Sequence, residues 1–167
     1  MKDKGLLLVH ANQYYDENHI KDKIIEALEE FNGKTYELPE NGLPSYGKEK
    51  GLYDQVLEEE EDGKLKMKDA INLTIKHDKM LLGGGFARGC MKNTYNSLKK
   101  ARNWTEEDTE IRVVPEISYE RYFTFSNLSG FKLNEIFTLE DVKDRDLEDL
   151  PTEISEYFQE EDIESIL

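Results

Sequence analysis

The stretch MLLGGGFARGCMKNT, residues 80–94, joins an apolar run to a glycine turn and then to the start of a helix-like segment. A short, continuous apolar run is typical of a strand that is buried on both faces, as in a parallel sheet. The consecutive glycines Gly83, Gly84 and Gly85 allow positive φ angles and close approach of the backbone. Residues 88–101 are predicted to form the helix that follows. This strand–turn–helix unit indicates an α/β domain, in which ligands bind beyond the carboxyl ends of the strands.

The N-terminal part of the chain shows the same alternation. Residues 5–9, GLLLV, predict a second buried strand, and apolar residues recur at helical spacing from Ile20 to Phe31. Residues 34–38 predict a third strand, which Pro39 closes. A strand, a helix and a strand in succession are the signature of a right-handed parallel crossover.

The rest of the chain continues the pattern. Residues 67–76 predict a helix, residues 111–114 a strand that Pro115 stops, and residues 117–125 a further strand at an edge. Residues 139–167 predict an acidic helical segment with an apolar stripe. We therefore predict one three-layer α/β/α domain of Rossmann-like type that spans all 167 residues and contains a largely parallel sheet.

An acidic run, EEEEDG, occupies residues 58–63. Leu52, Val56 and Leu57 before it suggest a short helix, of which the run would be the end. We interpret the run as a solvated helix end, because charge runs are usually exposed; a cation site is the alternative.

The formal net charge of −15 argues against a nucleic-acid partner, because so acidic a chain repels phosphate backbones. The one basic cluster, formed by Lys92, Lys99, Lys100 and Arg102, is interpreted as the solvated face and C-terminal turn of a helix. The first apolar run is too short for a signal sequence or a membrane span, and a single cysteine forms no internal disulfide. The sequence therefore predicts a cytoplasmic protein without a membrane partner.

Cys90 is the candidate nucleophile. It falls in the first turn of the predicted helix, whose free N–H groups favour an anion and stabilise a thiolate, and Arg88 adds positive charge nearby. We expect an apparent pKa for this thiol below that of a free thiol, ~8.5. The alternative interpretation is a small buried hydrophobic residue. A phosphate-binding loop is excluded, because Gly89 is followed by Cys90-Met91 and not by Lys-Ser or Lys-Thr.

These residues resemble the nucleophile segment of isochorismatase-like cysteine hydrolases. That segment has an apolar strand, a glycine six residues before the cysteine, a small apolar residue after it and a threonine four residues on, which here are Gly84, Cys90, Met91 and Thr94. GLLLVHANQYY resembles the first strand of the family with its turn, and IRVVPEISY resembles the strand after the nucleophile helix. Residues 39–76 lie outside the resemblance.

The resemblance implies an Asp–Lys–Cys catalytic set that hydrolyses amides or vinyl ethers, and frequent oligomerisation. The aspartate would fall at His10, and histidine can also take a thiol proton. The lysine is placed at Lys66, with Lys64, Lys68, Lys48 and Lys50 as rivals. The oxyanion or anion site would use the N–H of Cys90 and the turn residues Gly85, Phe86, Ala87 and Arg88. Substrate-binding candidates are Asn12, Gln13 and Tyr14.

The sequence thus favours a divergent cysteine hydrolase that acts on a small amide or related molecule, without a cofactor. No histidine lies between His19 and His77, so the zinc cluster of the family's nicotinamidases is not expected. The alternative is a non-catalytic member of the fold that binds a small anion or a protein. A homo-oligomer is compatible with both.

Overall fold

The structure is a computed structural model that describes residues 2–11, 18–42, 50–85, 89–121 and 136–138. Its elements follow one another in the order β1 (Asp3–Val9), α1 (Asn18–Glu30), β2 (Lys34–Leu38), β3 (Gln55–Val56), β4 (Glu59–Glu61), β5 (Lys64–Leu65), α3 (Met67–Lys76), β6 (His77–Gly84), α4 (Cys90–Thr105), β7 (Glu110–Arg121) and β8 (Ile136–Thr138).

The main sheet has the strand order β3-β2-β1-β6-β7-β8. Its first five strands are parallel to one another, and β8 pairs antiparallel with β7. The predicted α/β class with a largely parallel sheet is therefore confirmed. Strands β4 and β5 form a separate antiparallel hairpin, called here the acidic hairpin (residues 59–65).

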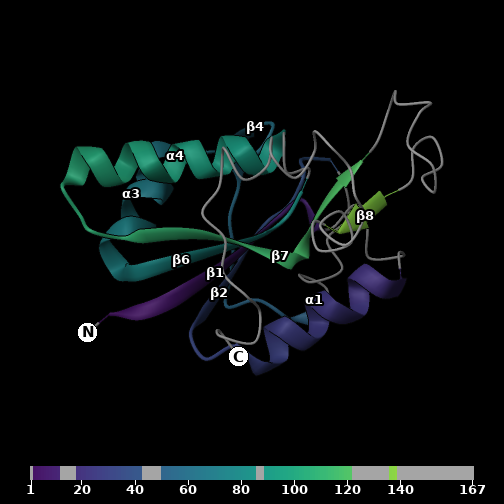
Figure 1. Cartoon of the computed structure of the whole chain (residues 1–167). Coiled ribbons are helices and arrows are strands. Elements are labelled where there is room, and N and C mark those ends of the chain that lie inside the picture. The colour runs from purple at the N-terminus through teal and green to yellow at the C-terminus, as the bar shows by residue number, and fades with distance from the viewer. Residues whose placement is uncertain (1, 12–17, 43–49, 86–88, 122–135, 139–167) are drawn as a thin grey trace, which may run out of the picture.

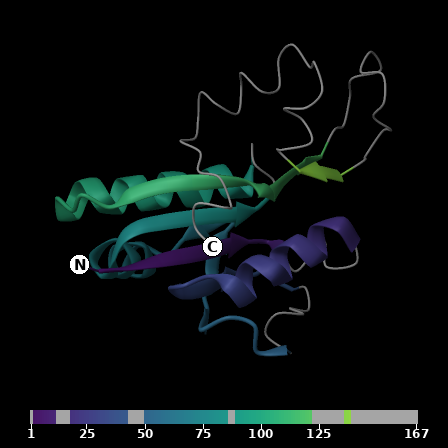
Figure 2. The same cartoon turned by 60° about the horizontal axis from the view of Figure 1, so that its bottom comes forward.

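Helices cover both faces of the sheet, with α1 on one side and α3 and α4 on the other (Figures 1 and 2). The period of two in strand β1 divides its apolar residues between the two layers. Leu6 and Leu8 belong to the core that includes Ile24 of α1, whereas Leu7 belongs to the core that includes Leu98 of α4. Because both faces are covered, the strands read as continuous apolar runs.

The prediction of a short helix around Leu52, Val56 and Leu57 is wrong. Residues 55–56 form the edge strand β3, which extends the parallel sheet next to β2, and residues 59–61 form β4. The interpretation of the acidic run as a helix end is wrong with it. Sheet pairing outweighs the weak apolar spacing of this segment, because the main-chain groups of β2 would otherwise lack partners on that side.

The prediction that Pro115 stops a strand is wrong. Strand β7 continues through it, and its register with β6 shifts between Leu82 and Gly84. Proline has no N–H for the ladder, so a position in such a bulge is where a strand tolerates it. Across the bulge, the Ser118 hydroxyl donates a hydrogen bond to the Val114 carbonyl at 2.7 Å.

Strands β1 and β6 end side by side, with Val9 opposite Gly84. Gly84 has a φ of +93°, and a Cβ at this position would lie 2.0 Å from the Val9 carbonyl oxygen. Only glycine allows this approach, which brings His10 and the turn before Cys90 to one edge of the sheet.

The predicted acidic helical segment 139–167 lies outside the described residues, as does the part of the predicted 117–125 strand after residue 121. Among the residues that the structure describes, no helix is long and apolar enough to cross a membrane.

At the opposite edge of the sheet, a buried histidine is held in one protonation state. The Nδ1–H of His77 donates to the Asp3 carbonyl at 2.8 Å, and the Tyr36 hydroxyl then donates to its Nε2 at 2.7 Å. Burial lowers the pKa of His77 below its ordinary value. Burial, followed by the nearby charge of Asp54, raises the pKa of Tyr36.

A stability change with pH follows from His77. Below the unfolded-state pKa of about 6.5 the unfolded chain takes up the proton first, so the free energy of unfolding falls as pH falls. One such proton gives a slope of up to about 1.4 kcal/mol per pH unit. Urea unfolding between pH 7.5 and 5.5 measures the slope in the wild type and in His77→Gln, where we expect it to be smaller. Equal slopes in the two proteins would contradict the assignment.

Candidate functional site

The site begins with a buried, hydrogen-bonded pair of side chains, His10 and Glu59, at the carboxyl end of β1. His10 follows this strand with a φ of +53°, and its backbone N–H donates to the Leu38 carbonyl at 2.8 Å. Its Nε2 lies 2.5 Å from Oε2 of Glu59, in the acidic hairpin. The two side chains are 3% and 4% exposed. The hairpin therefore delivers a carboxylate to the residue where the resemblance places the catalytic base.

Glu59 is satisfied by backbone donors as well as by the imidazole. The N–H of Gly63 donates to its Oε2 at 2.8 Å, and the N–H of Asn41 donates to its Oε1 at 3.2 Å. Burial alone would raise the pKa of Glu59, but the hydrogen bonds from His10, Gly63 and Asn41 outweigh it and lower the pKa. Glu59 is therefore a carboxylate at neutral pH.

Sequence reasoning missed Glu59, because the acidic run was interpreted as solvated. The signal that could have revealed it is the dipeptide Asp62-Gly63. Both residues have positive φ, +45° and +81°, which is the requirement of the two-residue turns that join β-hairpins. An Asp-Gly pair is a strong local signal for such a turn, and alternation along β4 turns Glu59 inward while Glu60 stays exposed.

The same hairpin packs against the first turn of α4, which begins at Cys90. A Cβ on Gly63 would lie 2.2 Å from the Cys90 carbonyl oxygen, so the two backbones are in direct contact. The Thr94 hydroxyl donates to the Gly63 carbonyl at 2.6 Å and lies 3.1 Å from the Cys90 carbonyl. Thr94 thus ties the first turn of α4 to the hairpin.

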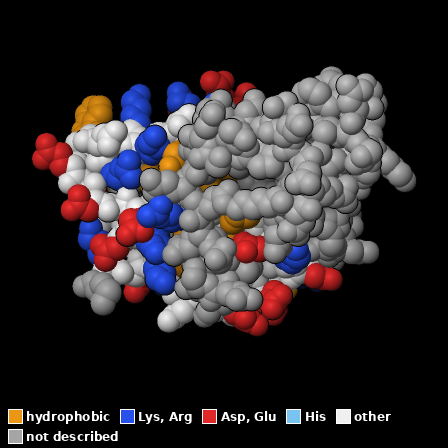
Figure 3. Space-filling view, in the orientation of Figure 1, with side chains coloured by type: hydrophobic (Ala, Val, Ile, Leu, Met, Phe, Trp, Pro, Cys, Tyr) orange, Lys and Arg blue, Asp and Glu red, His pale blue; other side chains and the backbone are white. Residues whose placement is uncertain are grey.

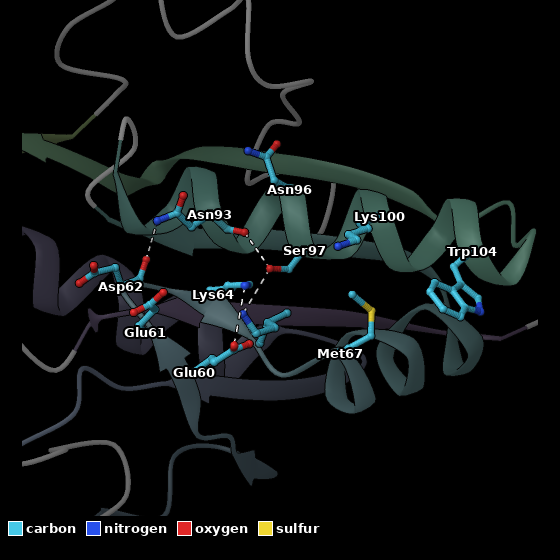
Figure 4. A pocket seen from close by; sticks show the side chains of 11 residues that line it. Glu60, Glu61, Asp62, Lys64, Met67, Asn93, Asn96, Ser97, Lys100 and Trp104 are labelled. Atoms are coloured by element: carbon cyan, nitrogen blue, oxygen red, sulfur yellow. Dashed lines mark hydrogen bonds and ion pairs between the residues drawn. The ribbon is translucent and has the colours of Figure 1, made fainter.

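The outer side of the acidic hairpin forms a groove of about 650 Å³ with α4 and the start of α3 (Figure 4). Figure 4 shows Asp62 at the turn, facing Asn93 of α4, whose Nδ2 donates to the Asp62 carbonyl at 2.8 Å. A second contact lies further along, where the N–H of Leu65 donates to the Ser97 hydroxyl at 3.3 Å. These contacts fix the hairpin in place against α4.

The expectation of a lowered pKa for the Cys90 thiol is wrong. Burial, followed by the charges of Asp62, Glu59 and Glu40, raises the pKa of Cys90 to about 11. Within the described part of the chain, a hydrogen bond from the backbone N–H of Cys90 itself acts in the opposite direction and lowers this pKa. The thiol is half-buried and protonated at neutral pH, so a base is needed for it to attack.

Of the other predicted site residues, the structure describes Lys66 and Gly85. Lys66 lies before α3, where its Nζ is 2.9 Å from Oε2 of Glu58, and both side chains are exposed. The Gly85 N–H donates to the Val9 carbonyl at 2.9 Å, so it is engaged within the sheet edge. Outside the described residues lie Asn12, Gln13, Tyr14, Phe86, Ala87 and Arg88. Within the described ranges, no group of three or more His, Cys, Asp or Glu side chains is arranged to hold a metal ion.

The basic cluster predicted on α4 lies on that helix. Lys99 places its ammonium 5.5 Å from the centre of the Tyr95 ring, and Arg102 donates to the Thr109 carbonyl at 3.3 Å near the end of the helix. Lysine and arginine side chains gather over α4 at the top of the described surface in Figure 3. Cations in the last turn of a helix suit its dipole, so the cluster has an ordinary structural explanation.

No family model matches the chain, and no curated protein matches it. Solved structures do match. An isochorismatase from Pseudomonas putida has a TM-score of 0.62 and 11% identity, and the match covers 99% of this chain and 90% of that one. The chain has the isochorismatase-like fold.

Two further structures agree with this assignment. A nicotinamidase from Staphylococcus aureus has a TM-score of 0.51 and 17% identity, with coverage of 71% of this chain and 83% of that chain. The MAR1 ribonuclease from Caenorhabditis elegans has a TM-score of 0.52 and 13% identity, with coverage of 70% of this chain and 65% of that chain. At these identities the likeness shows the fold alone.

Proposed function

We propose that the chain is a divergent isochorismatase-like hydrolase that cleaves a small amide, with Cys90 as nucleophile and His10 as general base. The observation that carries the proposal is the buried His10–Glu59 pair, held by the same hairpin that packs against the backbone of Cys90. A nucleophile, a base and a group that orients the base are the elements of a cysteine hydrolase.

Each group has a definite part in the reaction. Nε2 of His10 is bonded to Glu59, so its Nδ1 is the atom that takes the thiol proton. Glu59 holds the imidazole in one orientation and stabilises the imidazolium that forms. The thiolate attacks the amide carbon, and N–H groups at the start of α4 stabilise the oxyanion. The imidazolium protonates the departing amine, and water then hydrolyses the thioester to the acid.

This assignment replaces the Asp–Lys pair of the family resemblance with a His–Glu pair. In both pairs a proton acceptor at the end of the first strand is hydrogen-bonded to a charged side chain. The catalytic role predicted for Lys66 stays a prediction, and the proposal does not require it, because Glu59 already orients the base.

The test is the hydrolysis of a panel of primary amides, measured by the ammonia that is released. We expect Cys90→Ser to lower kcat/KM by about 10³-fold or more, because the attacking thiol is lost. We expect His10→Gln to lower it by about 10²-fold to 10³-fold, since the general base is removed. Asp108→Asn, at an exposed position, is the matched control and should keep full activity. Activity that survives Cys90→Ser would refute the proposal.

A second candidate is a non-catalytic member of the fold that acts as a protein-binding module. The raised pKa of Cys90 favours it, because a thiol that stays protonated is a poor nucleophile by itself. In that case no amide in the panel would be hydrolysed, and Cys90→Ser would retain binding to a recoverable partner.

A further inference from the structure

We propose that the groove between the acidic hairpin, α4 and the start of α3 binds an extended peptide segment of a partner protein. The bound segment carries a basic residue at the hairpin end of the groove and an apolar residue at the Trp104 end. The groove lies on the outer side of the hairpin, whereas Glu59 faces inward to His10. The inference is therefore independent of the proposed hydrolysis.

The groove has the dimensions of a peptide-binding site. Its volume is about 650 Å³, within the range of sites that bury most of a ligand. About three turns of α4, from Asn93 to Trp104, form one wall and extend for about 16 Å. An extended chain advances by about 3.3 Å per residue, so the groove accommodates about five residues of a peptide.

Trp104 is the anchor at one end of the groove. Its side chain is 73% exposed, although tryptophan is one of the most highly buried residue types on average. Figure 4 shows its ring at the end of the groove, with Lys100 and Met67 next to it on the side of the hairpin. Tryptophan and methionine are enriched in protein interfaces, where a buried tryptophan often carries much of the binding energy. An apolar side chain of the partner is therefore expected to cover this end.

Two carboxylates are available at the opposite end. Figure 4 shows Glu61 and Asp62 together at the turn of the hairpin. In the ranges that the structure describes, neither carboxylate takes part in a hydrogen bond or an ion pair. Their neighbour Glu60 lies 3.7 Å from Lys64, so this lysine is engaged with a different carboxylate. A lysine or arginine of the partner complements this end.

The middle of the groove suits a peptide main chain. Figure 4 shows the ammonium of Lys100 pointing along the groove toward Ser97. No acceptor for this ammonium is present in the described part of the chain. Carbonyl oxygens of an extended peptide are suitable acceptors for it.

Charge complementarity favours a basic protein segment over the other large anionic or cationic partners. The carboxylates at the hairpin end and the net charge of −15 repel the phosphates of nucleic acids and the headgroups of anionic lipids. The same field attracts a basic segment and accelerates its association.

The fluorescence of Trp104 reports on the groove directly, because this residue is the only tryptophan of the chain. The probes are acetyl-Lys-Lys-Gly-Leu-Phe-amide and the peptide with the same residues in reverse order, since the groove does not fix the direction of the chain. With at least one of them, we expect the emission to shift to shorter wavelength as the ring leaves water, and the affinity to fall with added salt. The absence of a shift with both peptides, up to millimolar concentration, would overturn the inference.

Two control peptides, made in the order that binds better, separate charge from apolar contact. Replacement of both lysines by glutamate reverses the charge, and replacement of leucine and phenylalanine by serine removes the apolar side chains. We expect each control to bind at least about tenfold more weakly than the basic peptide. Equal affinity for the charge-reversed peptide would contradict the complementarity from which the partner is inferred.

Variants of the protein locate the binding, measured by the fluorescence anisotropy of a dye-labelled basic peptide. Trp104→Ala should lower the affinity by about tenfold or more, and Glu61→Gln and Asp62→Asn by about twofold to threefold each. Glu29→Gln is the matched control, because Glu29 is exposed on α1, across the sheet from the groove (Figure 2). Affinity that is unchanged in all three groove variants would place the peptide elsewhere and overturn the inference. Circular dichroism verifies that each variant is folded.

Analytical ultracentrifugation distinguishes a partner peptide from a second copy of this chain. We expect Trp104→Ala to leave the sedimentation coefficient of the protein unchanged, because the groove is open to a different molecule. A change from a larger assembly to a smaller one would show that a second copy occupies the groove, and it would overturn the proposal of a separate partner.

Discussion

Gly63→Ala is expected to lower the free energy of unfolding by about 3–5 kcal/mol, one of the two largest effects that we expect from single substitutions. The new methyl group would meet the Cys90 carbonyl oxygen at 2.2 Å and its carbonyl carbon at 2.6 Å. Both contacts are with backbone, which cannot rotate away. The φ of +81° adds the ordinary strain of an L-residue in the left-handed region.

Gly42→Ala is the matched control for this variant. Its φ of +83° is nearly the same, but nothing lies within 4 Å of the added Cβ. It should therefore report the backbone strain alone, about 1–2 kcal/mol. Urea unfolding of the two variants separates strain from contact. Equal losses of stability would show that the hairpin and the start of α4 are not in contact.

Glu59→Gln is expected to destabilise the protein by about 2–3 kcal/mol, because it removes the buried carboxylate to which His10 is hydrogen-bonded. Glu60→Gln is the control, since Glu60 is exposed and lies 3.7 Å from Lys64 at the surface. It should change stability by no more than about 0.5 kcal/mol. Chemical denaturation at pH 7 measures both, and a small loss in Glu59→Gln would contradict the buried pairing.

The pH dependence of Glu59→Gln gives an independent check. The folded-state pKa of Glu59 is lowered, so its contribution to stability is present above the unfolded-state pKa and is lost as pH falls through the folded-state pKa. The stabilities of the wild type and of Glu59→Gln should therefore converge in acid. A constant difference across the acidic range would show that the carboxylate charge is not the source of the effect.

Much of the fold was predictable because its signals are local. The apolar runs of β1 and β6, the spacing of α1 and the Gly84 turn each specify their element within a few residues. The errors arose where a partner distant in sequence decides the outcome. Strand β3 exists because β2 offers it an edge, and β7 continues past Pro115 because a bulge absorbs the missing donor.

The candidate site was predictable only in part, for the same reason. Cys90 and His10 follow strands that the pattern reveals, so their shared edge of the sheet could be anticipated. Glu59 reaches that edge because the acidic hairpin carries it there. Its side chain contacts His10, which is 49 positions away in the sequence, and Gly63, which is 4 positions away. The charge around Cys90 likewise depends on two segments, the acidic hairpin and the residues after β2, whose proximity no local pattern encodes.

The acidic hairpin has a consequence for any attempt to re-engineer the protein. Side chains alternate along a strand, so one residue inserted before Glu59 would exchange the inward and outward sets of β4. The carboxylate of Glu59 would then point to solvent and away from the imidazole of His10. The turn of the hairpin, which packs against α4, would be displaced as well. A change in the length of the hairpin would therefore alter the surroundings of His10 and of Cys90 together. Specificity is better varied by substituting side chains than by changing the length of this loop.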